Sequence, residues 1–151
     1  MSEKIKTYEH IRSVQRNMIS FATDLLNRAE LHDQSKLVEP EAAIFEAMTP
    51  KLAGLTYNSP EYKEALKELG PALVHHYKHN SHHPEHYAEG LSGFDLLDLV
   101  EMFCDWAAAT ERHENGSLSR SIDQNKERFG YDGIMHSILH KSKRLMPARK
   151  E

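Results

Sequence analysis

The chain has 151 residues, of which 39% are hydrophobic and 28% are charged, a composition typical of one globular domain rather than of a disordered chain. Its formal net charge of −4 argues against attraction of the whole molecule to nucleic acid or to an anionic membrane. The single cysteine excludes a disulfide within the chain, and the sequence has neither a signal-peptide-like start nor an apolar run of ~18 residues. We therefore expect a soluble, cytoplasmic protein.

Apolar residues at helical spacing predict a long first helix over residues 8–29, and His10 begins the same apolar stripe. A shorter helix is expected over residues 41–48. Pro40 lies just before this segment, and proline is common where a helix starts. Pro50 lies just beyond it, and proline in a helix interior usually ends the helix.

The segment 59–61 has the order of a helix start, with an N-cap serine, a proline at the first helical position and an acid in the first turn. We expect this helix to end at Gly70, and Pro71 to begin another that runs to about His79. Residues 80–93 are expected to form a loop, because the segment carries one proline and two glycines.

The most apolar predicted helix covers residues 94–113. Ser92 and Asp95 have the spacing of a capping box at its start, and Asn115-Gly116 is expected to break the chain after it. A helical wheel of this segment centres the apolar stripe on Leu96, Val100, Phe103 and Ala107.

Two short helices are expected near the end of the chain, around residues 121–128 and 134–144. Strand-like alternation is absent throughout the sequence, so we predict an all-α fold: a single compact helical domain of about six helices. The predicted domain covers residues 1–151, with a motif-bearing core at 8–112, C-terminal helices at 119–145 and a basic tail at 146–151.

Histidine is concentrated in one part of the sequence. The chain has 11 histidines, and six of them fall within twelve consecutive positions: His75, His76, His79, His82, His83 and His86. Imidazole is the commonest metal ligand and carries protons near neutral pH, so we expect at least two of the six to bind metal or substrate. His86 is expected to be a surface residue without such a role.

Two acidic positions outside this run are candidate ligands. His32-Asp33 is an adjacent imidazole–carboxylate pair that can chelate one divalent cation, and Lys36 follows three residues later, where it can meet an anionic substrate. Asp105 lies in an otherwise apolar predicted helix. The wheel places it with Asp98, Glu101 and Arg112, which leaves two alternatives: a solvated acidic face, or a central helix that is buried on most sides. Cys104, Phe103 and Trp106 of the same helix are expected to be core residues.

The order of these residues resembles that of the HD-domain superfamily of metal-dependent phosphohydrolases: His10, His32-Asp33, His75-His76 and Asp105. The segment 75–110 is also similar to the HD-GYP subgroup in its double histidine and in the spacing to the aspartate, although it lacks the GYP tripeptide. The run at 79–85 resembles an uncharacterised phage and bacterial family of small helical proteins.

The HD resemblance implies hydrolysis of a nucleotide or another small phosphate ester or anhydride at one or two divalent transition-metal ions (Mn, Fe, Ni, Co or Zn). The metal ligands that it implies are His10, His32, Asp33, His76 and Asp105. The side chains expected to neutralise phosphate oxygens or protonate the leaving group are Lys36, His75, His79, His82 and His83. The expected partner is thus a small phosphorylated substrate, and homo-oligomer formation stays open.

One departure from the family order leaves alternatives open, because no histidine lies between Asp33 and His75. Either the site is mononuclear, or a glutamate (Glu39, Glu41 or Glu46) substitutes, or a later histidine (His79, His82 or His83) folds back to serve. Two other functions also remain: a di-iron oxygenase of HD type, and a non-catalytic, metal-binding helical module.

Overall fold

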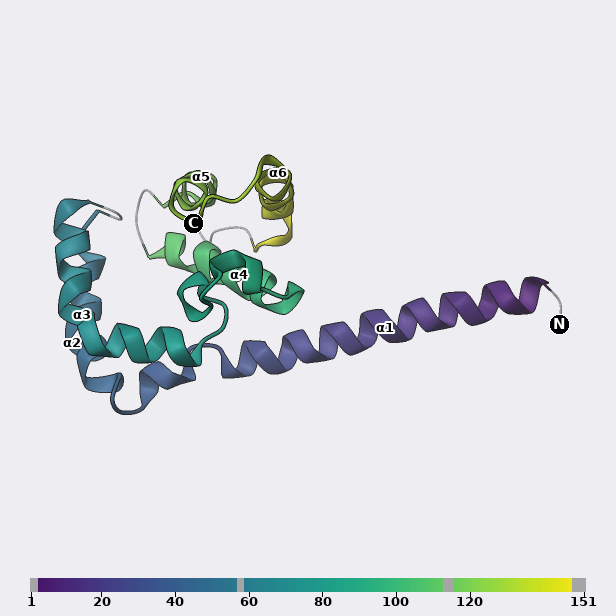
Figure 1. The fold of residues 1–151 in the computed structure, drawn as a ribbon, viewed down its shortest axis with the longest axis horizontal. Helices are drawn as coiled ribbons and strands as arrows, with labels where there is room; N and C mark the ends of the chain where they lie inside the picture. Colours follow the sequence, from purple (N-terminus) through teal and green to yellow (C-terminus); the bar gives the residue numbers. More distant parts are fainter. Residues whose placement is uncertain (1–2, 57–58, 113–115, 148–151) are drawn as a thin grey trace. The chain divides into compact units, whose positions relative to one another are not determined.

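The computed structural model describes residues 3–56, 59–112 and 116–147 of the chain (Figure 1). Every regular element in these ranges is helical, with six α-helices and four short 3₁₀ segments, so the predicted all-α fold class is confirmed. The chain forms two compact units, Met1–His32 and Asp33–Glu151. No change in composition marks this boundary in the sequence, and the expected helix end at His113 and the break at Asn115 lie outside the described residues.

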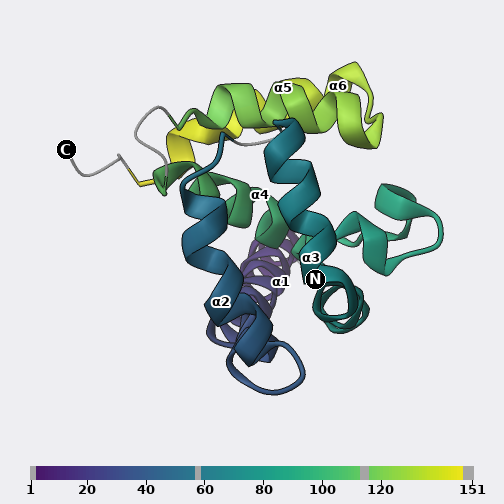
Figure 2. The same cartoon turned by 90° about the vertical axis from the view of Figure 1, so that its left-hand side faces the viewer.

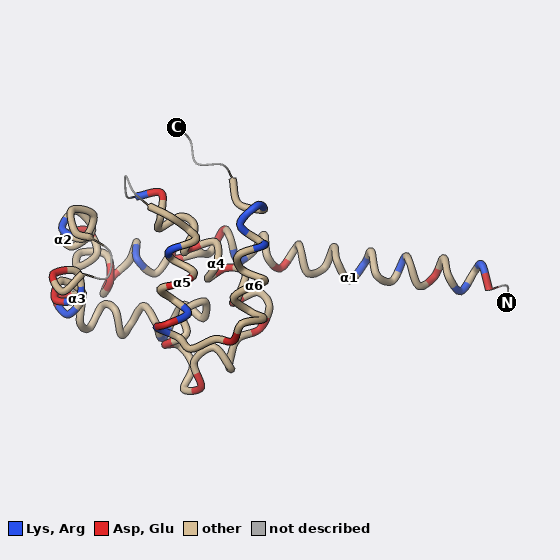
Figure 3. Tube along the Cα trace, turned by 90° about the horizontal axis from the view of Figure 1, so that it is seen from above, with Lys and Arg blue, Asp and Glu red and all other residues tan. Residues whose placement is uncertain are grey.

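The first unit is a single helix, α1 (Glu3–Leu31), which is longer at both ends than the predicted helix. Charged residues of both signs are spread along it, as Figure 3 shows. One helix has no partner within its own unit, so the apolar side chains of the predicted stripe, such as Val14 and Met18, are exposed at 42% and 67%. None of the helices in the described ranges is long and apolar enough to cross a membrane.

The second unit begins with a short 3₁₀ segment, η1 (Gln34–Leu37), and two helices that pack side by side, α2 (Ala42–Ala53) and α3 (Pro60–His79) (Figure 2). Their shared core holds Met48 and Leu69. The expected stop before Pro50 is wrong, because α2 continues one turn beyond it. Leu52, in that extra turn, packs against the same core. Burial of its apolar side chain offsets the stability lost with the backbone hydrogen bond that proline cannot donate.

The predicted punctuation of α3 is confirmed. Ser59 is the N-cap, and its side chain accepts a hydrogen bond from the backbone N–H of Tyr62 at 3.1 Å. Gly70 breaks the helix with φ 26° and ψ −106°, a conformation open to glycine, and Pro71 begins the second segment. The second segment ends at His79, as expected, and it carries the first three clustered histidines.

The expected loop after α3 holds two 3₁₀ turns, η2 (Pro84–His86) and η3 (Gly90–Gly93), and leads into α4 (Leu96–Glu111). The predicted cap at Ser92 is wrong. The N-cap is Asp95, whose carboxylate accepts from the backbone N–H of Asp98, while the Asp98 carboxylate accepts from the backbone N–H of Asp95. Ser92 instead lies within η3, and the helix begins at Leu96, two residues later than predicted.

The predicted apolar stripe of α4 is wrong in its centre, because Leu96 is 66% exposed. The side chains that form the core with α5 (Leu118–Phe129) and α6 (Gly133–Ser142) are Met102, Phe103 and Trp106. The expectation that Phe103 and Trp106 lie in the core is confirmed, whereas Cys104 is exposed. A single wheel fails here because α4 is covered on two sides, by this core and by the loop that carries the histidines.

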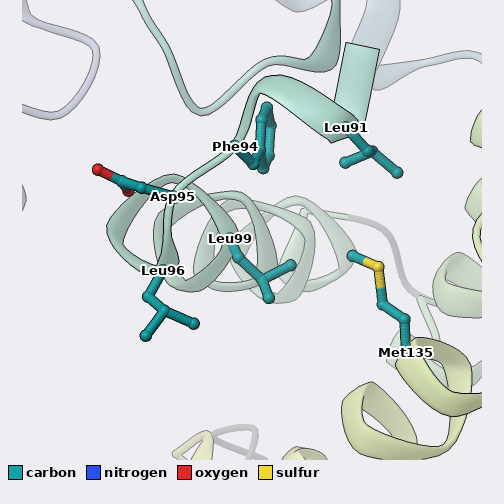
Figure 4. Close-up of a pocket in the computed structure, with 6 residues that line it drawn as sticks. All are labelled: Leu91, Phe94, Asp95, Leu96, Leu99 and Met135. Atoms are coloured by element: carbon teal, nitrogen blue, oxygen red, sulfur yellow. The ribbon is translucent and has the colours of Figure 1, made fainter. Parts of the chain in front are cut away.

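A pocket of about 440 Å³ lies beside the start of α4 (Figure 4). Leu99 of α4 and Met135 of α6 line it, together with Leu91 and Phe94 from the segment before the helix. Its one carboxylate, Asp95, is turned away from Met135 and is engaged as the cap of α4. The lining of this pocket is therefore mainly apolar, and the histidines and carboxylates that could bind a metal lie outside it.

Because Tyr131 is buried in this core, we expect the protein to lose stability at alkaline pH. Its hydroxyl donates to the Ile122 carbonyl at 2.5 Å, and burial, with a smaller contribution from Asp123, raises the pKa of Tyr131 to about 12. The pKa of tyrosine in an unfolded chain is near 10, so the folded state binds more protons than the unfolded state between pH 10 and 12. The free energy of unfolding therefore falls as pH rises through this range, by up to about 1.4 kcal/mol per pH unit. Urea unfolding should show a shallower loss above pH 10 for Tyr131→Phe than for the wild type, and equal slopes would contradict the assignment.

Candidate metal centre

Asp33 opens the second unit in a left-handed backbone conformation, with φ 56° and ψ 15°. Aspartate tolerates this region better than most residues other than glycine, because its short polar side chain can hydrogen-bond to the nearby backbone. The turn that follows, η1, carries Lys36, so the Asp33 carboxylate is presented at one end of a short, hydrogen-bonded element.

Three histidines surround the Asp33 carboxylate. The Nε2 atom of His76, near the end of α3, lies 3.2 Å from Asp33 Oδ1, and the Nε2 atom of His82, in the following loop, lies 3.6 Å from the same oxygen. His83 Nε2 lies 3.0 Å from His76 Nε2. His76 and His82 are each only 1% exposed. The fold thus converges one carboxylate and three imidazoles on a small buried volume.

These spacings suit a shared divalent cation. One ligand atom from each of Asp33, His76, His82 and His83 lies within 4.8 Å of the other three. A zinc-like ion binds histidine nitrogen and carboxylate oxygen at about 2.0–2.2 Å, so neighbouring ligand atoms in a tetrahedral shell lie about 3.4 Å apart. The measured separations of 3.0, 3.2 and 3.6 Å lie on both sides of that value.

Glu41 fixes the orientation of the His76 ring through Nδ1, the ring nitrogen that does not face Asp33. Its carboxylate is fully buried and forms hydrogen bonds with three groups. The Nδ1 atom of His76 lies 2.9 Å from it, Nδ1 of His75 lies 2.6 Å away, and the Ser35 hydroxyl donates to it at 3.0 Å. Burial by itself would raise the pKa of Glu41, but these three hydrogen bonds outweigh it and the pKa is lowered. An ionised carboxylate only accepts hydrogen bonds, so this contact favours the tautomer of His76 that carries its proton on Nδ1. In the neutral ring, Nε2 then keeps the lone pair that a metal requires.

Glu101 of α4 plays the corresponding part for His82. Its Oε1 atom lies 3.1 Å from His82 Nδ1, on the side of the ring away from Asp33. Two of the three histidines therefore have a carboxylate on Nδ1 and present Nε2 towards Asp33. This carboxylate–histidine arrangement is the usual outer support of a metal-binding imidazole, because it fixes both the tautomer and the direction of the ring.

The third histidine of the cluster is held in its neutral form. Burial, followed by the neighbouring His82 and His76 rings, lowers the pKa of His83 to about 2. A neutral imidazole has a lone pair to offer, whereas an imidazolium has none. His83 is therefore ready to bind a cation at any pH near neutrality.

Lys36 contacts the other oxygen of the aspartate. Its Nζ atom lies 2.6 Å from Asp33 Oδ2, and it also lies 5.1 Å from the centre of the Phe45 ring. The Lys36 side chain is 28% exposed, so its ammonium borders both the buried centre and solvent. This contact directs Asp33 Oδ1 towards the histidines and places a positive charge at the edge of the centre.

The loop that carries His82 and His83 is fastened to α4 through Asp98, which is 1% exposed. Ser81 donates its hydroxyl to Asp98 Oδ1 at 2.6 Å, and Tyr87 donates to Oδ2 at 2.9 Å. A buried carboxylate requires such donors, so the loop and α4 hold each other in register.

The comparisons with known proteins give one assignment. A model described as "Family of unknown function (DUF5662)" matches residues 2–146, nearly the whole chain. The chain belongs to this DUF5662 family. No curated protein and no solved structure matches it. The match says nothing of an HD-domain relationship, which stays a prediction from the sequence.

This DUF5662 structure brings some of the predicted site residues together and leaves others apart. Asp33 and His76, predicted as ligands, meet His82 and His83, predicted as catalytic groups, in one cluster. A carboxylate oxygen of Asp105 lies within 4.8 Å of one of Asp33. The acidic side of α4 is not a solvated face, since Asp98 is buried and Glu101 and Asp105 are partly buried.

The remaining predicted residues lie around the cluster or in the other unit. His75 contacts Glu41 rather than Asp33, and His79 is exposed and stacks on His75 with ring centres 4.0 Å apart. His10 lies in α1 and His32 is the last residue of the first unit, so their predicted roles as ligands stay predictions. Glu101 was missed as a support for the centre, because the wheel of α4 assigned one buried face only.

Proposed function

We propose that this protein is a metal-dependent phosphohydrolase that acts on a nucleotide or another small phosphate ester or anhydride. One observation carries the proposal: His76 and His82 each lie between Asp33 Oδ1 and a carboxylate that fixes the ring, which is the arrangement of a metal-binding histidine pair. The phosphate part rests on Lys36 beside this centre and on the resemblance of His32-Asp33 and Asp105 to the HD order.

The donor set favours a particular class of cation. Three imidazoles with one carboxylate suit Zn, Fe, Co, Ni or Mn, whereas Mg and Ca prefer sites made of oxygen alone. When bound, such an ion lowers the pKa of water and polarises a phosphoryl oxygen. The chain's own residues orient and neutralise: Glu41 and Glu101 hold the two rings, and Lys36 supplies a positive charge for a phosphate oxygen.

The test is metal-dependent turnover. We expect purified protein, supplied with manganese, iron, nickel, cobalt or zinc, to hold at least one ion per chain by elemental analysis and to release phosphate from a panel of nucleotides and simple phosphate esters. Protein that binds less than a tenth of an equivalent after incubation with each metal would contradict the proposal.

Lys36→Met separates the phosphate part from the metal part. At saturating metal we expect the variant to retain its ion but to lose about ten-fold or more in kcat/KM on the anionic substrate, since ~1.4 kcal/mol corresponds to a factor of ten. Lys36→Arg should recover part of the loss, because the guanidinium keeps the charge with a different reach. Lys51, an exposed lysine paired with Glu68 on the neighbouring helix, provides the matched control as Lys51→Met. Equal kcat/KM for Lys36→Met and Lys51→Met would return Lys36 to a structural role.

A di-iron oxygenase is a second candidate, because Asp33 has ligand atoms within 4.8 Å of the three histidines and of the Asp105 carboxylate and could serve two ions. Iron-loaded protein that consumes oxygen in the presence of a reductant, with two irons per chain and no phosphate release, would favour it over the hydrolase.

A further inference from the structure

The C-terminal hairpin holds a second cluster of metal-binding side chains that the proposed hydrolase does not use. Asp123 lies on α5, and His136 and His140 lie on α6. The two histidines are four residues apart, so they project from the same face of their helix, one turn above the other. That face is turned towards α5, which contacts α6 across a short turn that ends α5 at Gly130 (φ 67°) and begins α6 at Asp132.

Three ligand atoms converge in this cluster. Asp123 Oδ1 lies 2.8 Å from His136 Nε2 and 3.0 Å from His140 Nε2, and the two Nε2 atoms lie 3.2 Å apart. A triangle with these sides has a point about 2.1 Å from all three atoms, which matches the distance at which zinc-like ions bind imidazole nitrogen and carboxylate oxygen.

We propose that Asp123, His136 and His140 form a second metal site, which binds a divalent transition-metal ion of the zinc, nickel or cobalt type. Two imidazoles and one carboxylate suit these ions, whereas Mg and Ca would find one oxygen among two nitrogens. The three side chains are exposed at 58% (Asp123), 28% (His136) and 27% (His140), so an ion can enter from solvent. Its remaining coordination positions face water. The site is independent of the centre at Asp33 and would cross-link α5 to α6.

The alternative is a hydrogen-bonded group without an ion, in which both imidazoles donate to one carboxylate oxygen. Other hydrogen bonds hold the hairpin together, so the metal site and the ion-free alternative can be distinguished by substitutions that leave it folded. Lys143 donates to the Ser119 hydroxyl on α5, and Tyr131 donates to the Ile122 carbonyl. Replacing the exposed cluster should therefore leave the hairpin folded.

The experiment is a zinc titration of the full chain at neutral pH, followed by calorimetry and by competition with a chromophoric chelator. We expect the double variant His136→Gln/His140→Gln to bind one zinc fewer than the wild type. Asp123→Asn should weaken the same zinc by about ten-fold or more, since it replaces the anionic ligand by a neutral one. Glu127→Gln removes one exposed negative charge from the same helix and should bind zinc as the wild type does. Circular dichroism checks that each variant stays helical.

A background of Asp33→Ala distinguishes the two sites. In that chain the zinc at the hairpin should persist and should disappear when His136 and His140 are also replaced. Unchanged zinc stoichiometry and affinity in His136→Gln/His140→Gln would overturn the proposal, whatever the outcome at Asp33. Loss of all zinc in Asp33→Ala alone would overturn it too, because the ion would then belong to the first centre.

Discussion

Asp33→Ala is expected to abolish metal binding at the histidine cluster and to reduce phosphate release by about a thousand-fold or more, which corresponds to ~4 kcal/mol of lost transition-state stabilisation. Asp33 supplies the one anionic ligand among three neutral imidazoles, and its Oδ1 atom is the point on which His76 and His82 converge. Without it the cluster loses the charge that favours a divalent cation. Elemental analysis and the turnover assay measure the two effects.

Two controls separate the carboxylate from the backbone. Asp33 has a positive φ of 56°, so alanine introduces strain of about 1–2 kcal/mol that is unrelated to the metal. Asp33→Asn tolerates this conformation and keeps the shape of the side chain, and it should still lose most of the bound metal. Asp24→Ala, an exposed aspartate in α1, should change neither readout. An Asp33→Asn protein with wild-type metal content and turnover would show that the carboxylate is structural.

Local chemistry made several helix boundaries predictable. The N-cap at Ser59, the break at Gly70 and the turn before α6 each follow from residues that act within one turn of the chain. Pro50 shows the limit of such reasoning, because burial of Leu52 outweighs the local signal. Boundaries that depend on packing between helices could not be predicted from neighbours in the sequence.

The candidate site shows the same division. Asp33 and His76 could be named as candidate ligands from residue type and order, and the open alternative that a later histidine folds back agrees with the positions of His82 and His83 beside Asp33. The outer carboxylates were harder to identify. Glu41 stood as one of three interchangeable acids, and Glu101 lay on a side of α4 for which a solvated face and a buried face both stayed open. Which acid faces which ring depends on how α2 and α4 pack against the histidines, and that contact has no signature in a single sequence.

The hairpin cluster has a weak signature in hindsight. His136 and His140 have the spacing of two ligands on one helix face, and Asp123 precedes them by a distance that a short helical hairpin can close. This spacing is far less distinctive than the dense run of histidines at residues 75–86.

Glu41→Gln should lower the affinity of the histidine cluster for manganese or zinc by about 10-fold to 100-fold, the usual effect of removing an outer carboxylate from a metal-binding histidine. The glutamine amide brings two N–H donors to a place where Glu41 accepts from His75, His76 and Ser35. The amide oxygen can still accept, but the nitrogen faces other donors, so the His76 ring can change its tautomer and offer N–H instead of a lone pair to the cation.

The same substitution should also reduce the free energy of unfolding of the metal-free protein by about 1–3 kcal/mol, because a fully buried acceptor is exchanged for a partly unsatisfied group. Chelator competition measures the affinity, and urea unfolding measures the stability. Glu46→Gln provides the matched control, since Glu46 lies on α2, the helix that Glu41 precedes as N-cap, was an equal candidate by sequence and is exposed. If Glu41→Gln bound metal as tightly as Glu46→Gln while losing stability, Glu41 would support the fold alone, and the orientation of His76 would have to come from its packing against Phe45, whose ring centre lies 5.6 Å away.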